Sequence, residues 1–224
     1  MIIDNIGYVK TNVKMTSKYF IELSLPNKNN YIKDIYDKIH KDIMENEGVI
    51  PFDNYKFNNY IGDITKNIRW TWAINDESLT LFRNYIKPIY KEINNFFENE
   101  FEVFGASFIT LYEDNIKDSQ FHLDTNSQYD NINNTNILTV IFPLYMDDDM
   151  GGLEYYQNKE IEVYKYEKDK VFVWDACKLE HRTQSYTLKE KKKRVLVSLN
   201  LISIEEWAMK TIEKSLKCQG NIAF

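Results

Sequence analysis

His122-Leu123-Asp124, together with the strand-forming stretch that runs from it to Ile202, decides the fold of this chain. An extended strand points residues i and i+2 to the same face, so His122 and Asp124 reach one point in space while Leu123 packs on the other side. His181, far downstream, supplies a third ligand-type side chain. Two imidazoles and one carboxylate on one triangular face predict a metal site whose remaining positions stay open.

The composition is that of a folded protein with one substantial core. The chain has 224 residues, of which 43% are hydrophobic and 15% aromatic. Its net charge of -6 argues against binding to nucleic-acid phosphates, which needs clustered Lys and Arg. The one basic run, from Lys189 to Arg194, is interrupted by Glu190, and we expect it to form a solvated hairpin turn.

The sequence predicts a cytoplasmic protein that makes no membrane contact. Cys177 and Cys218 are too few for a disulfide framework, and the N-terminus lacks the pattern of a signal peptide. No stretch approaches the ~18 consecutive apolar residues that a transmembrane helix needs. Nothing in the sequence predicts the oligomeric state.

Two helical patterns occupy the first part of the chain. Tyr31 to Met44 has apolar residues at the three-and-four spacing of an amphipathic helix, and Glu77 to Glu98 does so more strongly. Pro88 should kink or break the second helix. His40 lies beside the first apolar stripe without a second ligand-type residue at matching spacing, so we interpret it as an ordinary helix histidine.

The segment from Ile68 to Ile74 alternates between apolar and polar residues and predicts a strand. The alternation places Trp70 and Trp72 on the same side of that strand. Two indoles on one face fit either the core or the wall of a substrate site.

After residue 100 the pattern changes to short strands separated by turn signals. The expected strands are Phe101 to Tyr112, Ile137 to Leu144, Leu153 to Tyr156, Ile161 to Tyr166, Lys170 to Trp174, His181 to Tyr186 and Arg194 to Ile202. They predict an antiparallel sandwich or barrel, so the fold class is mainly β with flanking helices (α+β). We expect a single domain over residues 1–224, with a helical support region at 1–100, a core at 101–202 and a C-terminal helix at 203–224. Asn126 to Asn136 is expected to be a long loop.

The order of these motifs resembles that of the 2-oxoglutarate- and Fe(II)-dependent dioxygenases, and within them the prolyl 4-hydroxylase-like group. The resemblance spans roughly residues 105 to 202 and implies a double-stranded β-helix (jelly-roll) core with helices on one side. The residues that carry it are Tyr112, His122, Asp124, the Gly151-Gly152 turn, His181 and Arg194.

The resemblance also implies a role for each residue. His122, Asp124 and His181 would bind Fe(II), and 2-oxoglutarate and then O2 would take the remaining positions. Arg194 would hold the far carboxylate of 2-oxoglutarate through its fork of donors. Tyr112 and Thr139 would add hydroxyl groups to the cosubstrate pocket.

The choice of Arg194 leaves alternatives open. Arg194 follows His181 at a slightly longer interval than the basic residue usually does in this family, so one of the three lysines at 191–193 could be the anchor instead. We favour Arg194 because the alternating strand from Arg194 to Asn200 starts there and puts Arg194, Leu196, Ser198 and Asn200 on one face.

The implied reaction is hydroxylation of an unactivated C-H bond with release of succinate and CO2. A carboxylate at Asp124 argues against halogenation, because halogenating relatives carry a small residue there. The substrate is either a peptidyl residue such as proline or a free amino acid or small metabolite, and the acidic balance disfavours nucleobase demethylation. The alternative is a non-catalytic jelly-roll binding module with a structural metal, although structural zinc normally has four protein ligands.

Overall fold

The computed structural model describes residues 14–25, 31–61, 68–117, 119–125, 135–203, 206 and 210. Its helices are α1 (Tyr31–Glu45), α2 (Asp76–Ile86), the 3-10 turn η1 (Lys87–Ile89) and α3 (Tyr90–Phe97). Its strands are β1 (Lys14–Ser17), β2 (Phe20–Ser24), β3 (Gly48–Phe52), β4 (Tyr55–Ile61), β5 (Ile68–Ala73), β6 (Glu102–Ile116), β7 (Ile137–Tyr145), β8 (Leu153–Gln157), β9 (Glu160–Tyr164), β10 (Lys170–Asp175), β11 (His181–Thr183) and β12 (Tyr186–Ile202).

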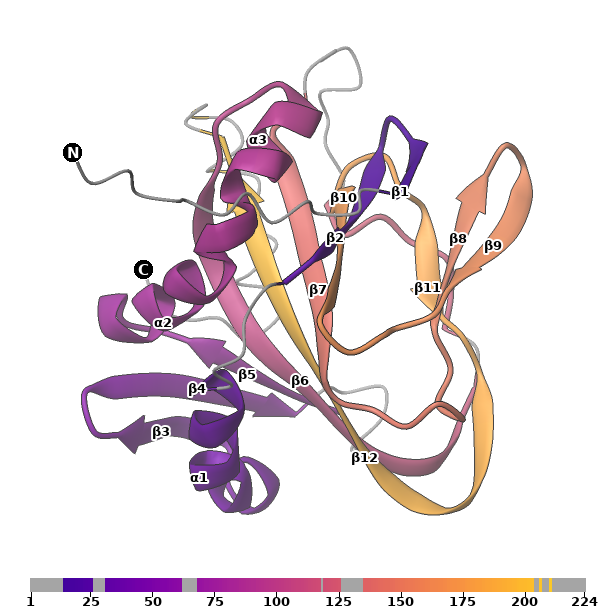
Figure 1. The fold of residues 1–224 in the computed structure, drawn as a ribbon. Coiled ribbons are helices and arrows are strands. Elements are labelled where there is room, and N and C mark those ends of the chain that lie inside the picture. Colours follow the sequence, from indigo (N-terminus) through magenta and orange to yellow (C-terminus); the bar gives the residue numbers. More distant parts are fainter. Residues whose placement is uncertain are drawn as a thin grey trace, which may run out of the picture.

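Two sheets of unequal size form the framework (Figure 1). The large sheet has nine strands in the order β1-β2-β10-β7-β12-β6-β5-β4-β3, and the small sheet has three in the order β11-β8-β9. All the strand pairs of both sheets are antiparallel. This arrangement confirms the predicted mainly β class and its jelly-roll core.

The helices pack on one face of the large sheet because their apolar stripes face it (Figure 1). In α1 the stripe comprises Ile32, Ile35, Tyr36, Ile39 and Ile43, all buried. These side chains pack with the helix-facing residues of the central strands in the largest hydrophobic cluster. Helix α2 begins after the N-cap Asn75, whose side chain accepts from the amide of Ser78 at 3.2 Å.

The break predicted at Pro88 is present. The chain leaves α2 at Ile86, passes through η1 and resumes as α3 at Tyr90. Proline lacks an amide hydrogen and cannot continue the α-helical bonding pattern, which explains the interruption.

The small sheet covers the opposite face of the large sheet and encloses a second core. Leu153, Tyr155 and Tyr164 from β8 and β9 pack against Phe172 and Trp174 of β10. Strand β11 is an edge strand of the small sheet. A bridge between His122 and His181 joins it to residues 119–125. The candidate metal ligands therefore lie between the two sheets.

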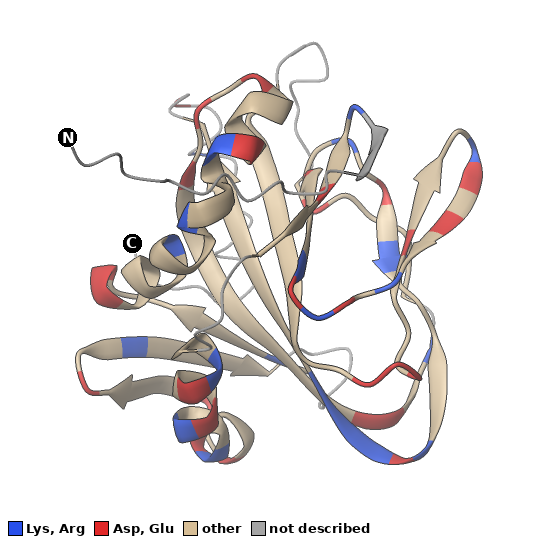
Figure 2. Ribbon diagram, viewed as in Figure 1, with Lys and Arg blue, Asp and Glu red and all other residues tan. Residues whose placement is uncertain are grey.

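The basic run is not a turn. Strand β12 begins at Tyr186, so the run from Lys189 to Arg194 lies inside it, alongside β6. The pairing of these two strands slips between Thr187 and Lys192, and an irregularity of this kind bends and twists a strand without ending it. Figure 2 shows the basic residues along this part of β12 beside acidic residues of its neighbours.

The first hundred residues contribute more than helices. Strands β2 and β5 pair with β10 and β6, and they extend the large sheet on both sides of its centre. The predicted strand at Ile68 to Ile74 is confirmed as β5. The predicted C-terminal helix falls almost wholly outside the described residues, as does most of the predicted loop from Asn126 to Asn136. The limits of the domain stay a prediction.

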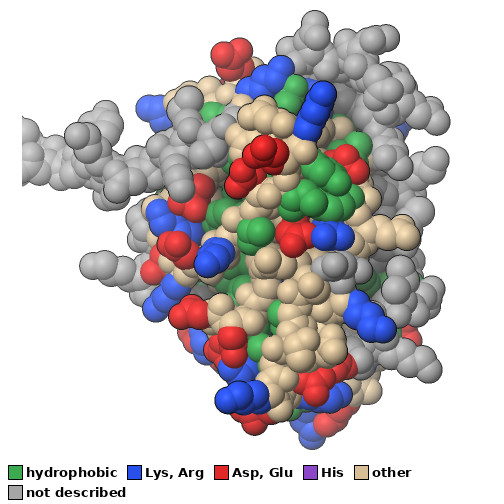
Figure 3. Space-filling model, turned by 90° about the vertical axis from the view of Figure 1, so that its right-hand side faces the viewer, with side chains coloured by type: hydrophobic (Ala, Val, Ile, Leu, Met, Phe, Trp, Pro, Cys, Tyr) green, Lys and Arg blue, Asp and Glu red, His purple; other side chains and the backbone are tan. Residues whose placement is uncertain are grey.

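The outer face of the small sheet carries a limited apolar patch. Tyr156, Ile161 and Val163 are exposed there, and Figure 3, which looks at this side, shows apolar side chains set among charges of both signs. Within the ranges that the structure describes, no helix combines the length and the apolar character needed to cross a bilayer. The cytoplasmic location stays a prediction.

Candidate metal centre

The structure brings His122, Asp124 and His181 together. His122 and His181 form an antiparallel bridge in which each amide donates to the other's carbonyl, at 2.9 and 3.0 Å. Residues paired in this way point to the same side of the sheet, and the two imidazole rings lie 4.7 Å apart between centres.

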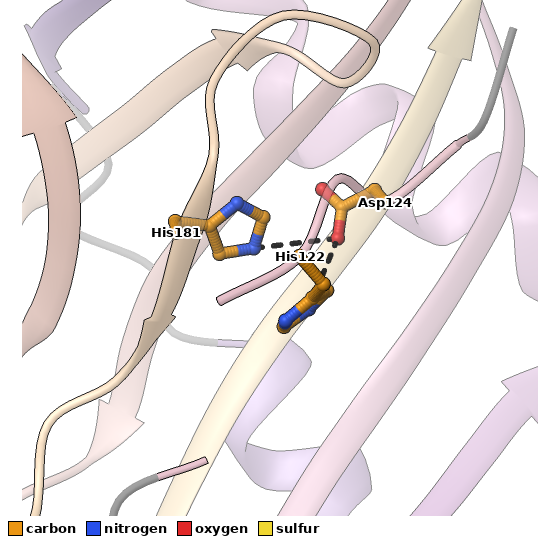
Figure 4. A group of neighbouring side chains, drawn as sticks. All are labelled: His122, Asp124 and His181. Atoms are coloured by element: carbon orange, nitrogen blue, oxygen red, sulfur yellow. Dashed lines mark ion pairs between the residues drawn. The ribbon is translucent and has the colours of Figure 1, made fainter. Parts of the chain in front are cut away.

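The carboxylate of Asp124 completes the group. Its Oδ1 lies 3.4 Å from Nε2 of His181 and 4.0 Å from Nε2 of His122 (Figure 4). One ligand atom from each of the three residues lies within 4.8 Å of the other two. Such spacing lets a single ion touch all three atoms.

The backbone fixes the tautomer of both histidines in the same manner. Nδ1 of His122 donates to the carbonyl of Gln120, and Nδ1 of His181 donates to the carbonyl of Leu179, each at 2.9 Å. A carbonyl can only accept, so the proton of the neutral ring is on Nδ1 and the lone pair is on Nε2. Both lone pairs are thereby available to a metal ion.

The other oxygen of Asp124 is held by the large sheet. Oδ2 accepts from the hydroxyl of Thr139 at 2.6 Å and from the indole Nε1 of Trp174 at 3.0 Å. Two donors on Oδ2 leave Oδ1 facing the histidines. Thr139, expected among the cosubstrate-binding residues, therefore acts through Asp124 in this structure. Trp174 was missed as a site residue, although its strand was predicted.

The charges of the group support one another. Burial by itself would raise the pKa of Asp124, but His181 and the hydroxyl of Thr139 bring it below its ordinary range. Burial would lower the pKa of His181, but the carboxylate of Asp124 raises it. A carboxylate that stays ionised beside two imidazoles has the chemistry of a site for a divalent cation.

The ligand set fits Fe(II). Two imidazole nitrogens and one carboxylate oxygen on one face are the protein ligands of non-haem Fe(II) oxygenases. The side chain of His181 is 5% exposed, while that of His122 is 51% exposed. An ion held here would sit at the border between core and solvent with coordination positions left over. Among the residues that can be placed, no fourth His, Cys, Asp or Glu joins the group.

Arg194 lies on the same face of the large sheet, as the alternation predicted. Leu196, two residues further, packs in the core between the sheets. Arg194 is 4% exposed, and its Nη1 has no hydrogen-bond partner in the described chain. Its guanidinium lies 5.5 Å from the ring centre of Tyr166. A buried cation with an unsatisfied donor is unfavourable unless an anion is provided.

Two phenol groups near this arginine are also unsatisfied. The hydroxyls of Tyr166 and Tyr186 are buried and have no hydrogen-bond partner among the described residues, and both feel the charge of Arg194. Burial raises the pKa of Tyr166 to about 12, with Arg194 opposing and Asp124 adding to the rise. Tyr166 therefore lies close enough to both Arg194 and Asp124 to feel their charges. A dicarboxylate bridging a metal and a guanidinium would satisfy these atoms, so the residues present fit 2-oxoglutarate.

The three lysines that precede Arg194 are engaged elsewhere. Lys193 pairs with Tyr112 and so lies on the opposite, helix-covered face. The partners of the lysines are Glu113 for Lys191 at 3.4 Å, Asp147 and Asp149 for Lys192 at 2.9 and 3.1 Å, and the ring of Tyr145 for Lys193 at 3.9 Å from its centre. Within the described part of the chain, Arg194 is the residue of this run that is buried and has no acid partner.

Tyr112 is not brought to the site. It stands opposite Lys193, whereas Leu111 stands opposite Arg194, so Tyr112 points away from the face that carries the metal ligands. It is also 45% exposed. The expectation that Tyr112 lines the cosubstrate pocket is corrected on this ground, and Tyr166 and Tyr186 are the phenols near Arg194.

The third histidine of the sequence, His40, and the thiol of Cys177 make contacts elsewhere. His40 lies on α1, where its Nδ1 is 3.1 Å from the hydroxyl of Tyr36. Cys177 is a free thiol whose sulfur lies 3.0 Å from the hydroxyl of Thr125. Neither residue belongs to the metal group.

Solved structures with this fold include 2-oxoglutarate-Fe(II) oxygenases. A prolyl-4-hydroxylase from Pseudomonas putida matches 83% of this chain and 92% of its own, with 11% identity and a TM-score of 0.52. The viral collagen prolyl hydroxylase of Paramecium Bursaria Chlorella virus-1, in complex with 2-oxoglutarate, matches 84% and 97%, with 10% identity and a TM-score of 0.53. The epimerase SnoN, in complex with Fe3+, alpha ketoglutarate and nogalamycin RO, matches 82% and 78%, with 9% identity and a TM-score of 0.54.

These likenesses establish the fold. No family model matches the sequence, and no curated protein matches it significantly. The resemblance indicated by the motifs is confirmed at the level of the fold, and the His-x-Asp and distal His of that fold are present.

Proposed function

We propose that this protein is an Fe(II)- and 2-oxoglutarate-dependent dioxygenase that hydroxylates an unactivated C-H bond and releases succinate and CO2. One observation carries the proposal: a His-Asp-His group, which no fourth ligand-type side chain joins among the described residues, lies on the same side of the sheet as the buried Arg194, whose Nη1 makes no hydrogen bond within those residues. The double-stranded β-helix fold, shared with 2-oxoglutarate-Fe(II) oxygenases, supports it.

In this proposal each residue has a defined task. His122, Asp124 and His181 hold the iron, which supplies activation of O2 when bound. Thr139 and Trp174 keep Oδ1 of Asp124 turned toward the ion. A carboxylate at this position occupies a coordination position that a halide would need, which favours hydroxylation.

The cosubstrate would be held at its far end by Arg194. The guanidinium offers parallel donors to a carboxylate, and the hydroxyls of Tyr166 and Tyr186 are available beside it. Because Arg194 is buried, the charge pair would form away from water, where it is strong. The apolar residues between the sheets would exclude water from the reacting atoms.

The substrate is either a peptidyl residue, possibly proline, or a free amino acid or small metabolite. Both classes appear among proteins with this fold, since two are prolyl hydroxylases and SnoN binds nogalamycin RO.

Anaerobic titration with Fe(II) and 2-oxoglutarate tests the proposal. Wild type should develop the visible metal-to-ligand charge-transfer band. Arg194→Ala should weaken the binding of 2-oxoglutarate by about tenfold or more, because a charge-assisted hydrogen bond is lost. Lys191→Ala is the matched control: it removes an exposed cation of the same strand and should leave the band unchanged. Folded, iron-loaded protein without a band would sink the dioxygenase proposal and favour a non-catalytic module.

A further inference from the structure

A row of side chains next to the metal ligands carries a polar atom that nothing in the described chain satisfies. Asn200 on β12 stands opposite Thr139 on β7, and Thr139 stands opposite Trp174 on β10. Residues opposite one another share a face, with Cβ atoms about 5 Å apart. Thr139 and Trp174 both donate to Asp124, so Asn200 is the next side chain along from the pair that supports the metal ligand.

Asn200 is 8% exposed, and its Oδ1 accepts no hydrogen bond from any described residue. An unsatisfied buried acceptor costs folding free energy, and an apolar side chain of similar shape would avoid that cost. An asparagine at this position therefore points to a ligand with a donor.

The adjacent row repeats the observation. Ser198 on β12 stands opposite Ser107 on β6, and Ser107 stands opposite Trp72 on β5. Ser107 is fully buried, and its hydroxyl also has no partner in the part of the chain that is described. Two unsatisfied oxygens thus lie in neighbouring rows on one face.

Indole rings border these oxygens. Trp72 packs with Ile137 and Ile202, and Trp70 is partly buried against the same cluster. Both predicted tryptophans thus lie on the site side of β5, where they offer a flat apolar surface to the carbon atoms of a ligand. Trp72 is the cross-strand neighbour of Ser107, so a ligand that reaches the Ser107 hydroxyl would lie along this indole.

The charges nearby disfavour an anion at this position. Asp124 lies beside the row, and Arg194 is the cation proposed for the cosubstrate. The other cations of β10 and β12 near this face are ion-paired: Lys170 with Glu22, Lys191 with Glu113, and Lys192 with Asp147 and Asp149. Among the described residues near this face, no cation other than Arg194 is therefore left to pair with an anion, so an uncharged donor suits Asn200 better than an anionic group.

We propose that Asn200 and Ser107 bind a carboxamide or peptide amide of the substrate, whose carbon atoms lie against Trp70 and Trp72. An amide matches both groups, because its N-H donates to Oδ1 of Asn200 and its carbonyl accepts from the hydroxyl of Ser107. The assignment rests on the proposed oxygenase function and narrows its substrate to amide-bearing compounds.

Two readouts test this assignment and separate it from the cosubstrate proposal. The probes are primary carboxamides that carry the side chains of the amino acids and no other amide group, and the matching carboxylic acids, which lack an amide altogether. Binding is followed by the thermal midpoint of the metal-free protein and by perturbation of the charge-transfer band in the Fe(II)-2-oxoglutarate complex. We expect at least one amide to bind, and its matching acid to bind at least tenfold more weakly. Equal binding of acids, or no binding of any amide, would overturn the assignment.

Variants identify the residues responsible. Asn200→Leu should weaken amide binding at least tenfold while its own thermal midpoint equals or exceeds that of wild type. Ser107→Ala should be as stable as wild type and should bind the same amide more weakly. Asn115→Leu, on an exposed part of β6, is the matched control and should bind normally.

Lowered stability in both site variants with unchanged amide binding would make these oxygens structural and contradict the inference. Absence of the charge-transfer band, with amide binding still dependent on Asn200, would overturn the cosubstrate proposal and leave the amide site standing.

Discussion

The indole Nε1 of Trp174 donates to Oδ2 of Asp124 at 3.0 Å, while its ring meets the ring of His181 edge-on at 5.0 Å between centres. One side chain of β10 thus orients two of the three metal ligands. Groups that orient metal ligands commonly change metal affinity by one to two orders of magnitude when they are removed. Trp174 is therefore a positioning residue of the site.

Trp174→Phe should weaken binding of Fe(II) or Mn(II) about 10- to 100-fold, because phenylalanine keeps the packing and loses the donor. Anaerobic metal titration measures the effect. Trp70→Phe, which alters an indole remote from Asp124, is the control and should bind metal normally. Equal affinities for the wild type and Trp174→Phe would show that the hydrogen bond does not orient the carboxylate.

Thr139 makes the shorter bond to the same oxygen, at 2.6 Å. Thr139→Val keeps the shape of the side chain and removes the donor, so it should also weaken metal binding about tenfold or more. Thr139→Ser retains the hydroxyl and should bind metal within a few-fold of wild type. If Thr139 instead contacts the cosubstrate directly, Thr139→Val should bind metal as wild type does. It should then need a higher concentration of 2-oxoglutarate for saturation.

The sequence predicted the metal group well because its information is local and periodic. His-x-Asp on an extended segment fixes two ligands by alternation, and the strand from Arg194 to Asn200 alternates clearly enough to place Arg194 inward. The elements themselves were predicted for the same reason, from α1 to the break at Pro88 and the strands beyond residue 100.

Tyr112 was misplaced because β6 is buried on both faces. Phe108 faces the helices and Leu111 faces the other side, and both are buried. A strand that is covered on both faces has no apolar-polar alternation, so its sequence does not show which set of alternate residues faces the metal ligands. Tyr166 was missed because it follows β9, outside any motif, and only long-range packing brings it to Arg194.

Metal affinity should fall as the pH is lowered, and the fall should begin at a higher pH than the ordinary pKa of an imidazole would predict. Protons compete with the metal for Nε2 of His181. Although burial lowers the pKa of His181, Asp124 raises it above the ordinary value of about 6.5, so protonation begins at higher pH. Titrating Mn(II) affinity against pH checks this, and affinity that stays constant down to pH 6 would contradict it.

The same shift has a consequence for the stability of the metal-free protein. A folded pKa raised above the unfolded value contributes stability that is complete below the unfolded pKa and is lost as pH rises through the folded pKa. The contribution of His181 should therefore decline as pH rises from about 6.5. Asp124→Asn removes the carboxylate charge, and chemical denaturation of this variant should show no such decline.

The Gly151-Gly152 pair should tolerate no side chain. A Cβ at Gly151 would lie 2.5 Å from the carbonyl oxygen of Gln184, and one at Gly152 would collide with the carbonyl oxygen of Tyr164. These contacts are with backbone, which cannot rotate away. Gly152→Ala should lower the free energy of unfolding by about 1–3 kcal/mol, as overpacking does. Urea denaturation measures it, and an unchanged midpoint would mean that the small sheet can shift.

A matched pair of substitutions can show which tyrosine hydroxyl binds 2-oxoglutarate. Tyr166→Phe removes a buried hydroxyl that lies beside Arg194 and makes no hydrogen bond within the described residues, so the fold should lose little stability. If that hydroxyl donates to the far carboxylate of 2-oxoglutarate, the variant should bind 2-oxoglutarate several-fold to tenfold more weakly at unchanged metal affinity. Tyr112→Phe removes an exposed hydroxyl on the opposite face and should bind it normally. Titration of the charge-transfer band measures both constants. The reverse result, with Tyr112→Phe impaired and Tyr166→Phe intact, would restore the assignment suggested by the motif and require β6 to turn its other face to the site.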